Sequence, residues 1–181
     1  MPEGPELRLA SMFINQVAAK HKFSGKVTKS ELATKPNHHP DVPFEAKCYT
    51  VFAETRGKEL KLHLYPQAND EKETKKKPKR TRPAAKKKKV EEVNQNEVKH
   101  LLIRFGMSGC FKLSPVDDIP KHAHLRFWCQ DKKNVLCFVD YRRFGTWKIN
   151  EDWGSDRGPD PVSTYKIFQV TGSFLLKSLQ L

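Results

Sequence analysis

The sequence predicts a mainly β fold with one N-terminal helix, in which two layers of strands form a β-sandwich and the helix docks on it. Two observations lead to this prediction. Apolar residues recur at helical spacing near the start of the chain, and six or more later segments alternate apolar and polar residues at hairpin spacing. We expect one domain in the 181 residues, with the sandwich over residues 1–150.

The helix is expected over residues 4–20. Glu3 and Glu6, at its start, suit the positive end of the helix dipole. One apolar face is formed by Leu7, Ala10, Phe13, Ile14 and Val17. Such a helix would pack on the sandwich and hold the first residues of the chain rigidly at one end.

The strands begin after about Gly25, where the apolar spacing changes to two. Residues 47–53 and 59–65 are predicted to pair as a hairpin, and the turn between them contains Gly57 and places Lys58 near its tip. Further strands are expected over residues 98–105, 110–113, 122–128, 134–141 and 144–149.

A basic insertion interrupts this pattern over residues 66–97. Between Asp70 and Glu92 the chain has eleven Lys or Arg and five Asp or Glu, a net charge of +6. Because the segment has almost no large apolar residue, we expect a disordered loop inside the sandwich domain. It is either a solvated insertion or an interaction segment, serving as a nuclear localisation signal or adding DNA affinity.

The overall composition indicates a polyanionic partner. The net charge of +13 favours nucleic acid first and an anionic membrane surface second. No apolar run reaches the roughly 18 residues of a membrane helix, and no secretory signal is evident, so we expect no membrane association. The four cysteines form no C-x-x-C pair, which predicts no metal site and a reducing compartment. We expect a monomer.

The first residues of the chain are candidates for covalent chemistry. If Met1 is removed, Pro2 exposes a secondary amine with a pKa near about 7.7–8, so a useful fraction is nucleophilic at neutral pH. Attack of this amine on a sugar aldehyde carbon gives an iminium ion, which favours elimination at the neighbouring carbon. Glu3 can then transfer protons. The alternative interpretation is a start codon followed by a proline in the first helical turn.

Three turns carry further candidates, each with a structural alternative. Lys58 is either a solvated turn residue or a group that clamps phosphate or transfers a proton. Met107, in a turn with two glycines, is either a partly buried side chain or a wedge in a base stack. Arg142, beside Arg143 and Phe144, can fill the position that a flipped base vacates.

His122 and His124 stand two positions apart and are expected on the same side of their strand. Two histidines without a third ligand make a poor metal site. The sequence therefore predicts phosphate contact or a plain surface role for this pair.

Five motifs in this order resemble the formamidopyrimidine-DNA glycosylase / endonuclease VIII family. They are Met1-Pro2-Glu3-Gly4-Pro5-Glu6, Arg56-Gly57-Lys58, Gly106-Met107-Ser108-Gly109, His122-Ala123-His124 and Asp140-Tyr141-Arg142-Arg143-Phe144-Gly145. The resemblance extends from residue 1 to about residue 169, interrupted by the basic insertion. It implies a nuclear base-excision-repair enzyme without a cofactor, which removes oxidised pyrimidines and ring-opened purines from duplex DNA, with bubble or single-stranded DNA as further substrates.

The resemblance also assigns roles to residues. Pro2 would form a Schiff base with C1′ of the damaged nucleotide, Glu3 would assist ring opening, and β,δ-elimination would then cut the strand. Lys58 would contact phosphate and support catalysis, and Glu6 would be an acidic residue at the active-site end of the helix. Three residues would enter the duplex when the base flips out, namely Met107, Arg142 and Phe144.

The C-terminal part departs from the family pattern. We expect residues 151–181 to be a linker followed by a non-family tail from Val170, and the family's helix–two-turn–helix domain and zinc finger are not evident. The chain is then either a DNA glycosylase with abasic-site lyase activity or a catalytically weak DNA-binding fragment. A basic β-sandwich that binds RNA or acidic proteins is the third interpretation.

Overall fold

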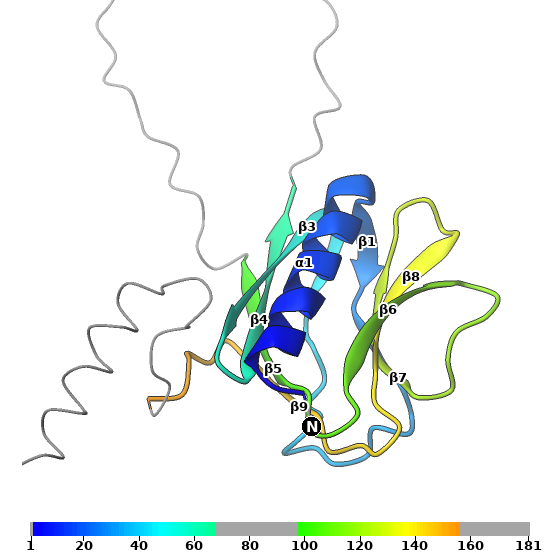
Figure 1. Cartoon of the computed structure of the whole chain (residues 1–181). Helices are drawn as coiled ribbons and strands as arrows, with labels where there is room; N and C mark the ends of the chain where they lie inside the picture. The colour runs from blue at the N-terminus through cyan, green and yellow to red at the C-terminus, as the bar shows by residue number, and fades with distance from the viewer. Residues whose placement is uncertain (1, 68–97, 156–181) are drawn as a thin grey trace, which may run out of the picture.

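The computed structural model describes residues 2–67 and 98–155. In this part of the chain one helix precedes nine strands (Figure 1). Their bounds are α1 Gly4–Lys20, β1 Phe23–Lys26, β2 Thr28–Lys29, β3 Glu45–Arg56, β4 Glu59–Pro66, β5 Lys99–Arg104, β6 Cys110–Pro115, β7 Ala123–Trp128, β8 Asn134–Val139 and β9 Thr146–Ile149. Most of the basic insertion predicted over residues 66–97 lies outside the described residues, and so does the whole tail beyond residue 155.

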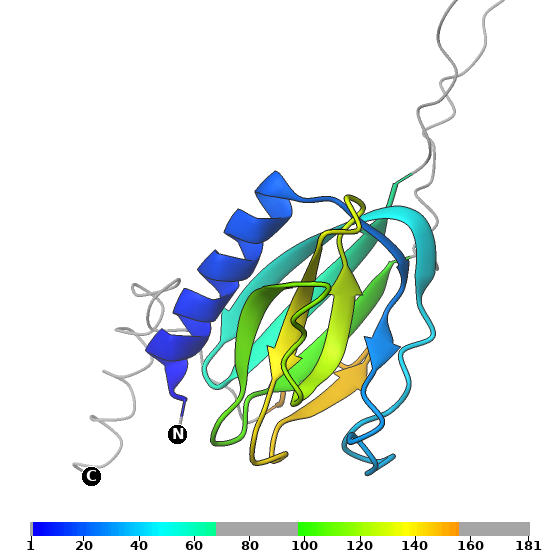
Figure 2. The same cartoon turned by 90° about the vertical axis from the view of Figure 1, so that its right-hand side faces the viewer.

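The strands form two antiparallel sheets that face each other. One sheet has the order β1-β3-β4-β5-β9 and the other the order β2-β7-β8-β6. Helix α1 lies along one side of the two layers, beside β3 and β6 (Figure 2). The prediction of a mainly β, two-layer sandwich with one N-terminal helix is confirmed.

Helix α1 is fixed to the sandwich by its apolar face and by one polar side chain. Leu7, Ile14 and Val17 are buried at the spacing that the sequence predicts. Asn15 donates to the carbonyl of Ala53 at 2.9 Å and accepts from its amide at 2.8 Å. Because β3 pairs with β1 only up to Tyr49, its next residues have an open edge, and Asn15 satisfies backbone groups that a neighbouring strand would otherwise bind.

The core lies between the sheets and follows the alternation of the strands. Leu60, Leu62 and Leu64 of β4 are fully buried, and Trp147 of β9 is the largest fully buried side chain among the described residues. Full burial of a large apolar side chain contributes about 1.5–3 kcal/mol. The core therefore holds the loops at the ends of these strands in fixed positions.

Two features of the fold differ from the sequence-based expectations. The short strands β1 and β2 were not predicted, because four and two residues are too few to show a periodicity. A surface role for His124 is wrong: its side chain is 1% exposed, and Nε2 donates to the Asp140 carbonyl at 2.9 Å. A bulge between Ala123 and Leu125 breaks the alternation there, which places His124 inside.

Within residues 2–67 and 98–155, no helix is both long enough and apolar enough to cross a membrane.

Candidate active site

One end of the sandwich brings together four segments that are far apart in the sequence. The N-terminus, the β3–β4 turn, the β5–β6 loop and the β8–β9 loop lie at this end in both side views (Figures 1 and 2). Six of the seven predicted site residues lie on or beside these segments, and Glu6 lies in the first turn of α1.

The β3–β4 turn positions Lys58 against the start of the helix. Arg56 pairs with Glu59 across the hairpin, which leaves Gly57 and Lys58 as a two-residue turn, and Gly57 has a φ of 56° that favours glycine. A side chain added at Gly4 would lie 3.7 Å from the Gly57 carbonyl, so the turn and the helix start are close neighbours.

Glu3 and Lys58 form an ion pair at this contact. Lys58 Nζ lies 2.8 Å from Oε1 and 2.7 Å from Oε2 of Glu3. Both side chains are about half exposed, with relative accessibilities of 50% for Glu3 and 44% for Lys58. A carboxylate and an ammonium group therefore stand together, open to solvent, directly after Pro2 in the chain. Such a pair can receive and donate protons to a bound substrate.

Glu6 has a structural partner at the same helix end. Its Oε2 accepts a hydrogen bond from the backbone amide of Glu3 at 3.0 Å, as in a capping box. This contact fixes the backbone of Glu3 and therefore the direction in which Pro2 leaves the helix. The structure thus gives Glu6 a defined task in holding the N-terminus, whatever further contact it makes.

Asp140 joins the β5–β6 loop to the β8–β9 loop. Its carboxylate is buried and accepts a short hydrogen bond from the hydroxyl of Ser108. The same carboxylate accepts the backbone amides of Arg142 at 3.2 Å and Gly145 at 2.6 Å. Ser108 Oγ also accepts the Arg142 amide at 3.0 Å. One carboxylate therefore fixes the geometry of both loops.

Gly106 strengthens this connection because no larger residue fits there. Its φ is 63°, and an added Cβ would lie 2.5 Å from the backbone carbon of Phe144. The two loop backbones are thus in direct contact. We conclude that the loop carrying Met107 and the loop carrying Arg142 and Phe144 form one unit.

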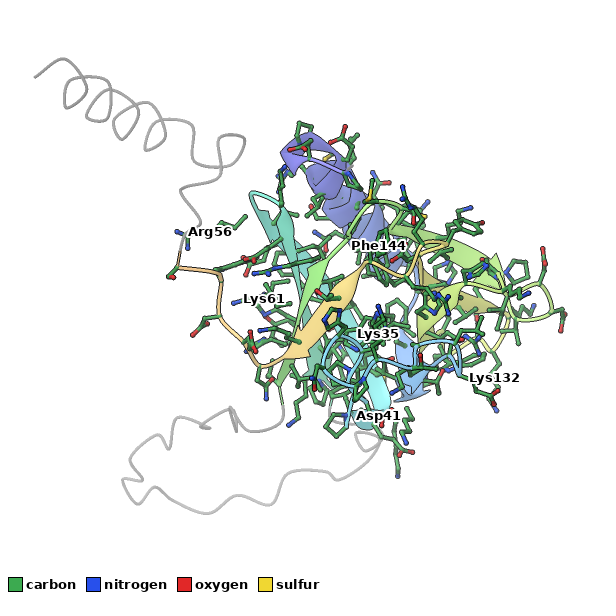
Figure 3. The ribbon with its side chains drawn as sticks, turned by 90° about the horizontal axis from the view of Figure 1, so that it is seen from below. Lys35, Asp41, Arg56, Lys61, Lys132 and Phe144 are labelled. Atoms are coloured by element: carbon green, nitrogen blue, oxygen red, sulfur yellow. The ribbon has the colours of Figure 1, made fainter. Side chains whose placement is uncertain are left out.

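The side chains that this unit presents are large and exposed. Met107 is 44% and Phe144 is 51% exposed, and the Arg142 guanidinium lies 5.2 Å from the centre of the Phe144 ring. Seen from this end, Phe144 lies near the middle of the molecule and Arg56 at its margin (Figure 3). Exposed apolar side chains beside a cation are suited to enter a base stack.

The side chain of His39 packs against the end of the β8–β9 loop and the start of β9. The sequence did not indicate this contact. The buried His39 ring stacks on Trp147 at 4.6 Å, and Nε2 donates to the Gly145 carbonyl at 2.8 Å. Burial lowers the pKa of His39 below its ordinary value, so the ring is neutral at neutral pH. The partners are 106 positions apart, and no local pattern indicates such a contact.

Glu59 is a second functional-site residue that sequence reasoning did not identify. It directly follows Lys58, is fully buried, and accepts from Arg104 Nη2 at 2.5 Å and Nε at 2.9 Å. Its other oxygen accepts the Gly154 amide at 3.1 Å. Glu59 therefore ties the β3–β4 turn to the strand that leads into the Met107 loop and to the segment that follows β9.

Comparison with known proteins identifies the class to which this fold and site belong. Residues 1–147 match the family model "Formamidopyrimidine-DNA glycosylase N-terminal domain". The chain is 40% identical over 171 residues to Endonuclease 8-like 1 of Homo sapiens and 39% identical to Endonuclease 8-like 1 of Mus musculus. The chain therefore belongs to the formamidopyrimidine-DNA glycosylase family.

These relatives are longer than the present chain. The matches include 93% of this chain but only 37% of each relative, so the chain spans a little over a third of their length. A crystal structure of Lactococcus lactis Fpg (MutM), in complex with a DNA that contains N7-benzyl-Fapy-dG, has a TM-score of 0.50 and 18% sequence identity. It covers 82% of this chain and 43% of the Fpg chain, and it supports the fold.

Proposed function

We propose that this chain takes part in base-excision repair as a DNA glycosylase with abasic-site lyase activity. The observation that carries the proposal is the contact of Glu3 with Lys58 directly after Pro2, in a chain that belongs to this family. A nucleophile, a proton-transferring carboxylate and a phosphate-binding cation are the groups that this chemistry needs.

The proposed reaction begins when Met1 is removed and the Pro2 nitrogen becomes a secondary amine. This nitrogen attacks C1′ of the damaged nucleotide and loses its proton, and the base leaves with the electron pair of the C1′–base bond and takes up that proton. The sugar ring opens as O4′ receives a proton, and the electron pair of nitrogen forms an iminium ion with C1′. In this proposal Glu3 transfers this proton to O4′.

The iminium ion then acts as the electron sink for two eliminations. Loss of a proton from C2′ expels the 3′ phosphate, and the following δ-elimination expels the 5′ phosphate. Water finally hydrolyses the iminium ion and releases Pro2. In this proposal Lys58 binds a phosphate and stabilises its charge, and the contact of its ammonium group with Glu3 supports this role.

The loop unit supports the other half of the proposal, which is access to the damaged base. An enzyme that acts on a base in a duplex must take it out of the stack, at a cost of a few kcal/mol. Met107, Arg142 and Phe144 are exposed on loops that Asp140 holds together, so they can enter the duplex as one rigid wedge. Glu6 contributes by holding Glu3.

The proposed substrates are oxidised pyrimidines and ring-opened purines in duplex DNA, with bubble and single-stranded DNA as further substrates. The net charge of +13 supports a nucleic-acid partner, and we propose that the protein acts in the nucleus as a monomer.

Borohydride trapping on duplex DNA with an abasic site tests the proposal. The matched control is the same chain with a Gly-Ser extension before Pro2, in which the Pro2 nitrogen is an amide and cannot attack. We expect a covalent adduct with the processed chain only. Equal trapping of both proteins would contradict the assignment of Pro2.

A DNA-binding fragment without catalysis is the second candidate. Asp140 holds the two exposed loops together through bonds that do not involve the Glu3–Lys58 pair. DNA binding by these loops therefore does not require the amine of Pro2. Tight binding to abasic duplex without trapping or strand cleavage would favour this candidate.

A further inference from the structure

An exposed apolar surface lies on the outer face of the five-stranded sheet and belongs to none of the loops that build the candidate active site. Phe52 of β3 and Tyr65 of β4 are 48% and 39% exposed, and each ring lies 6.0 Å from the ring of His63. Outward positions of an antiparallel sheet are usually polar where they face water. The three rings are contiguous, so this part of the face is suited to being covered.

Helix α1 extends this surface around the edge of the sheet. Met12 is 47% exposed and lies one turn before Asn15 on the same side of the helix. Asn15 bonds both backbone groups of Ala53, which directly follows Phe52. Met12 therefore stands next to the strand that carries Phe52. We call Met12, Phe52, His63 and Tyr65 the outer apolar surface.

The segment that follows β9 already covers the neighbouring part of the same face. The Lys61 ammonium group lies 4.6 Å from the centre of the Trp153 ring, and only 8% of the Lys61 side chain is exposed. The Gly154 amide donates to Oε2 of Glu59 at 3.1 Å. Lys61 and His63 are two positions apart on β4 and point to the same face. The covered part of the sheet therefore borders the outer apolar surface.

The chain continues from this point with residues 156–181, which lie outside the described residues. Gly154 is fixed at Glu59, and Glu59 pairs with Arg56 at the margin of the molecule (Figure 3). Phe52 is about 13 Å from Arg56 along β3, at about 3.3 Å per residue. Residues 156–172 span about 55 Å when extended. Residues 173–181 can therefore reach the outer apolar surface.

Residues 173–181 have a composition that matches this surface. Five of these nine residues are large and apolar, and Leu175, Leu176 and Leu179 recur at helical spacing. Lys177 is the one charged residue of the segment, and Glu54, with 44% of its side chain exposed, lies beside His63 at the edge of the surface. Apolar contact and opposite charge both favour this segment. The basic insertion, by contrast, has almost no large apolar residue.

We propose that residues 173–181 dock on the outer apolar surface and extend the contact that Trp153 makes with the sheet. A flexible tether gives an effective concentration of about 1 mM, so a contact with a dissociation constant of about 0.1 mM is about nine-tenths occupied. The outer apolar surface contains none of the residues assigned to the proposed reaction. Docking is therefore independent of that reaction.

Photo-cross-linking in the full chain identifies what covers the surface. Benzoylphenylalanine replaces Phe52, and the matched control carries it in place of Tyr141, which is exposed on the β8–β9 loop. A mixture of isotope-labelled and unlabelled chains distinguishes contacts within one chain from contacts between copies. We expect position 52 to cross-link to a peptide within residues 173–181 of the same chain, and position 141 not to do so. A cross-link from position 52 to a second copy, to residues 68–97 or to no peptide would overturn the proposal.

Trypsin cleavage after Lys177 gives a second readout. Phe52→Ser and Leu175→Ser change the two sides of the contact, and each should speed this cleavage about tenfold, because the undocked fraction rises from about one tenth to nearly all. The double variant should be cleaved no faster than either single variant, since both remove the same contact. Tyr141→Ser is the control and should be cleaved like the wild type. Wild-type cleavage in either single variant, or multiplied effects in the double variant, would contradict docking.

Discussion

The ammonium group of Lys58 lies 2.8 and 2.7 Å from the two carboxylate oxygens of Glu3, although 55 positions separate the residues. The contact joins a hairpin turn to the start of a helix, and Pro2 leaves the helix beside it. Because both groups are half exposed, the pair adds little to the stability of the fold: exposed ion pairs contribute about 0.2–1 kcal/mol.

Glu3→Gln and Lys58→Ala are each predicted to lower the activity strongly and to change the stability of the fold very little. Each should lower the rate of strand cleavage at abasic sites about 10²–10⁴-fold, while the free energy of unfolding changes by less than about 1 kcal/mol. Glu151→Gln is the control, since Glu151 forms an ion pair of similar exposure with Lys148, in which each side chain is 48% exposed. A loss of cleavage in Glu151→Gln would argue against a specific role of the Glu3–Lys58 pair.

Asp140→Asn should loosen the unit formed by the β5–β6 and β8–β9 loops. The NH2 group that replaces one oxygen cannot accept a hydrogen bond. In one orientation of the amide the buried Gly145 amide loses its acceptor, and in the other the Ser108 hydroxyl loses its acceptor. We expect a loss of about 2 kcal/mol or more in the free energy of unfolding by urea, and weaker binding to abasic duplex. Asp118→Asn, at an exposed aspartate, should change neither quantity.

Gly106→Ala tests the close approach of the same two loops. The left-handed backbone alone costs about 1–2 kcal/mol, and contact of the new Cβ with the Phe144 backbone adds a further penalty of about 1–3 kcal/mol. Gly25→Ala separates the cost of the left-handed backbone from the cost of the steric contact. Gly25 has a φ of 77°, but an added Cβ there would meet no atom within 4 Å. Equal melting temperatures for the two variants would contradict the contact.

Stability is predicted to fall as the pH is lowered from about 7.5 to 5. Burial lowers the pKa values of His39 and His124 in the folded protein, so the unfolded chain, with an ordinary value near 6.5, binds more protons. Their contribution to the free energy of unfolding is complete above the histidine pKa of the unfolded chain. It is lost as the pH falls toward the lower histidine pKa values of the folded protein. Each histidine adds at most about 1.4 kcal/mol per pH unit.

The measurement is the midpoint of urea unfolding across this pH range. His39→Gln removes one of the two groups and should reduce the slope of stability against pH, whatever its effect on absolute stability. His38→Gln, at an exposed neighbour whose charge is a lesser cause of the low pKa of His39 than burial, should change the slope less than His39→Gln does. The same slope in all three proteins would show that buried neutral His39 does not contribute.

Cysteine reactivity should follow burial. Burial raises the pKa of Cys129 to about 12 and of Cys137 to about 11, so almost no thiolate exists at pH 8 in the folded protein. Mass spectrometry after iodoacetamide treatment should show Cys48, which is partly exposed, labelled first. Cys129 and Cys137 should react only in denaturant, and fast labelling of either in the native protein would contradict their placement in the core.

The parts of the fold that depend on local pattern could be predicted from the sequence. Helix α1 shows its apolar face at helical spacing, and the hairpin of β3 and β4 shows alternation on both sides of Gly57. Strands β1 and β2 could not be predicted, because they exist only through pairing with residues far along the chain, such as Thr28 with Arg126.

In the candidate site, too, some residues could be predicted from the sequence, whereas the contacts that hold them could not. Pro2, Lys58 and Met107 were predicted as candidates from their residue types at a terminus or in a turn and from the resemblance of their motifs to the family. The contacts that hold them, from Asp140 to Ser108 and from His39 to Gly145, depend on three-dimensional proximity. A buried carboxylate or histidine has no signature in the chain before its partners are known.

The most direct test of the account is the position of the covalent bond in the borohydride-reduced adduct with abasic duplex DNA. Tandem mass spectrometry of the digested adduct reports the modified residue. The account predicts a peptide that begins at Pro2, lacks Met1 and carries the sugar on the proline nitrogen. A sugar attached to Lys58 or to another lysine, with Pro2 unmodified, would contradict it.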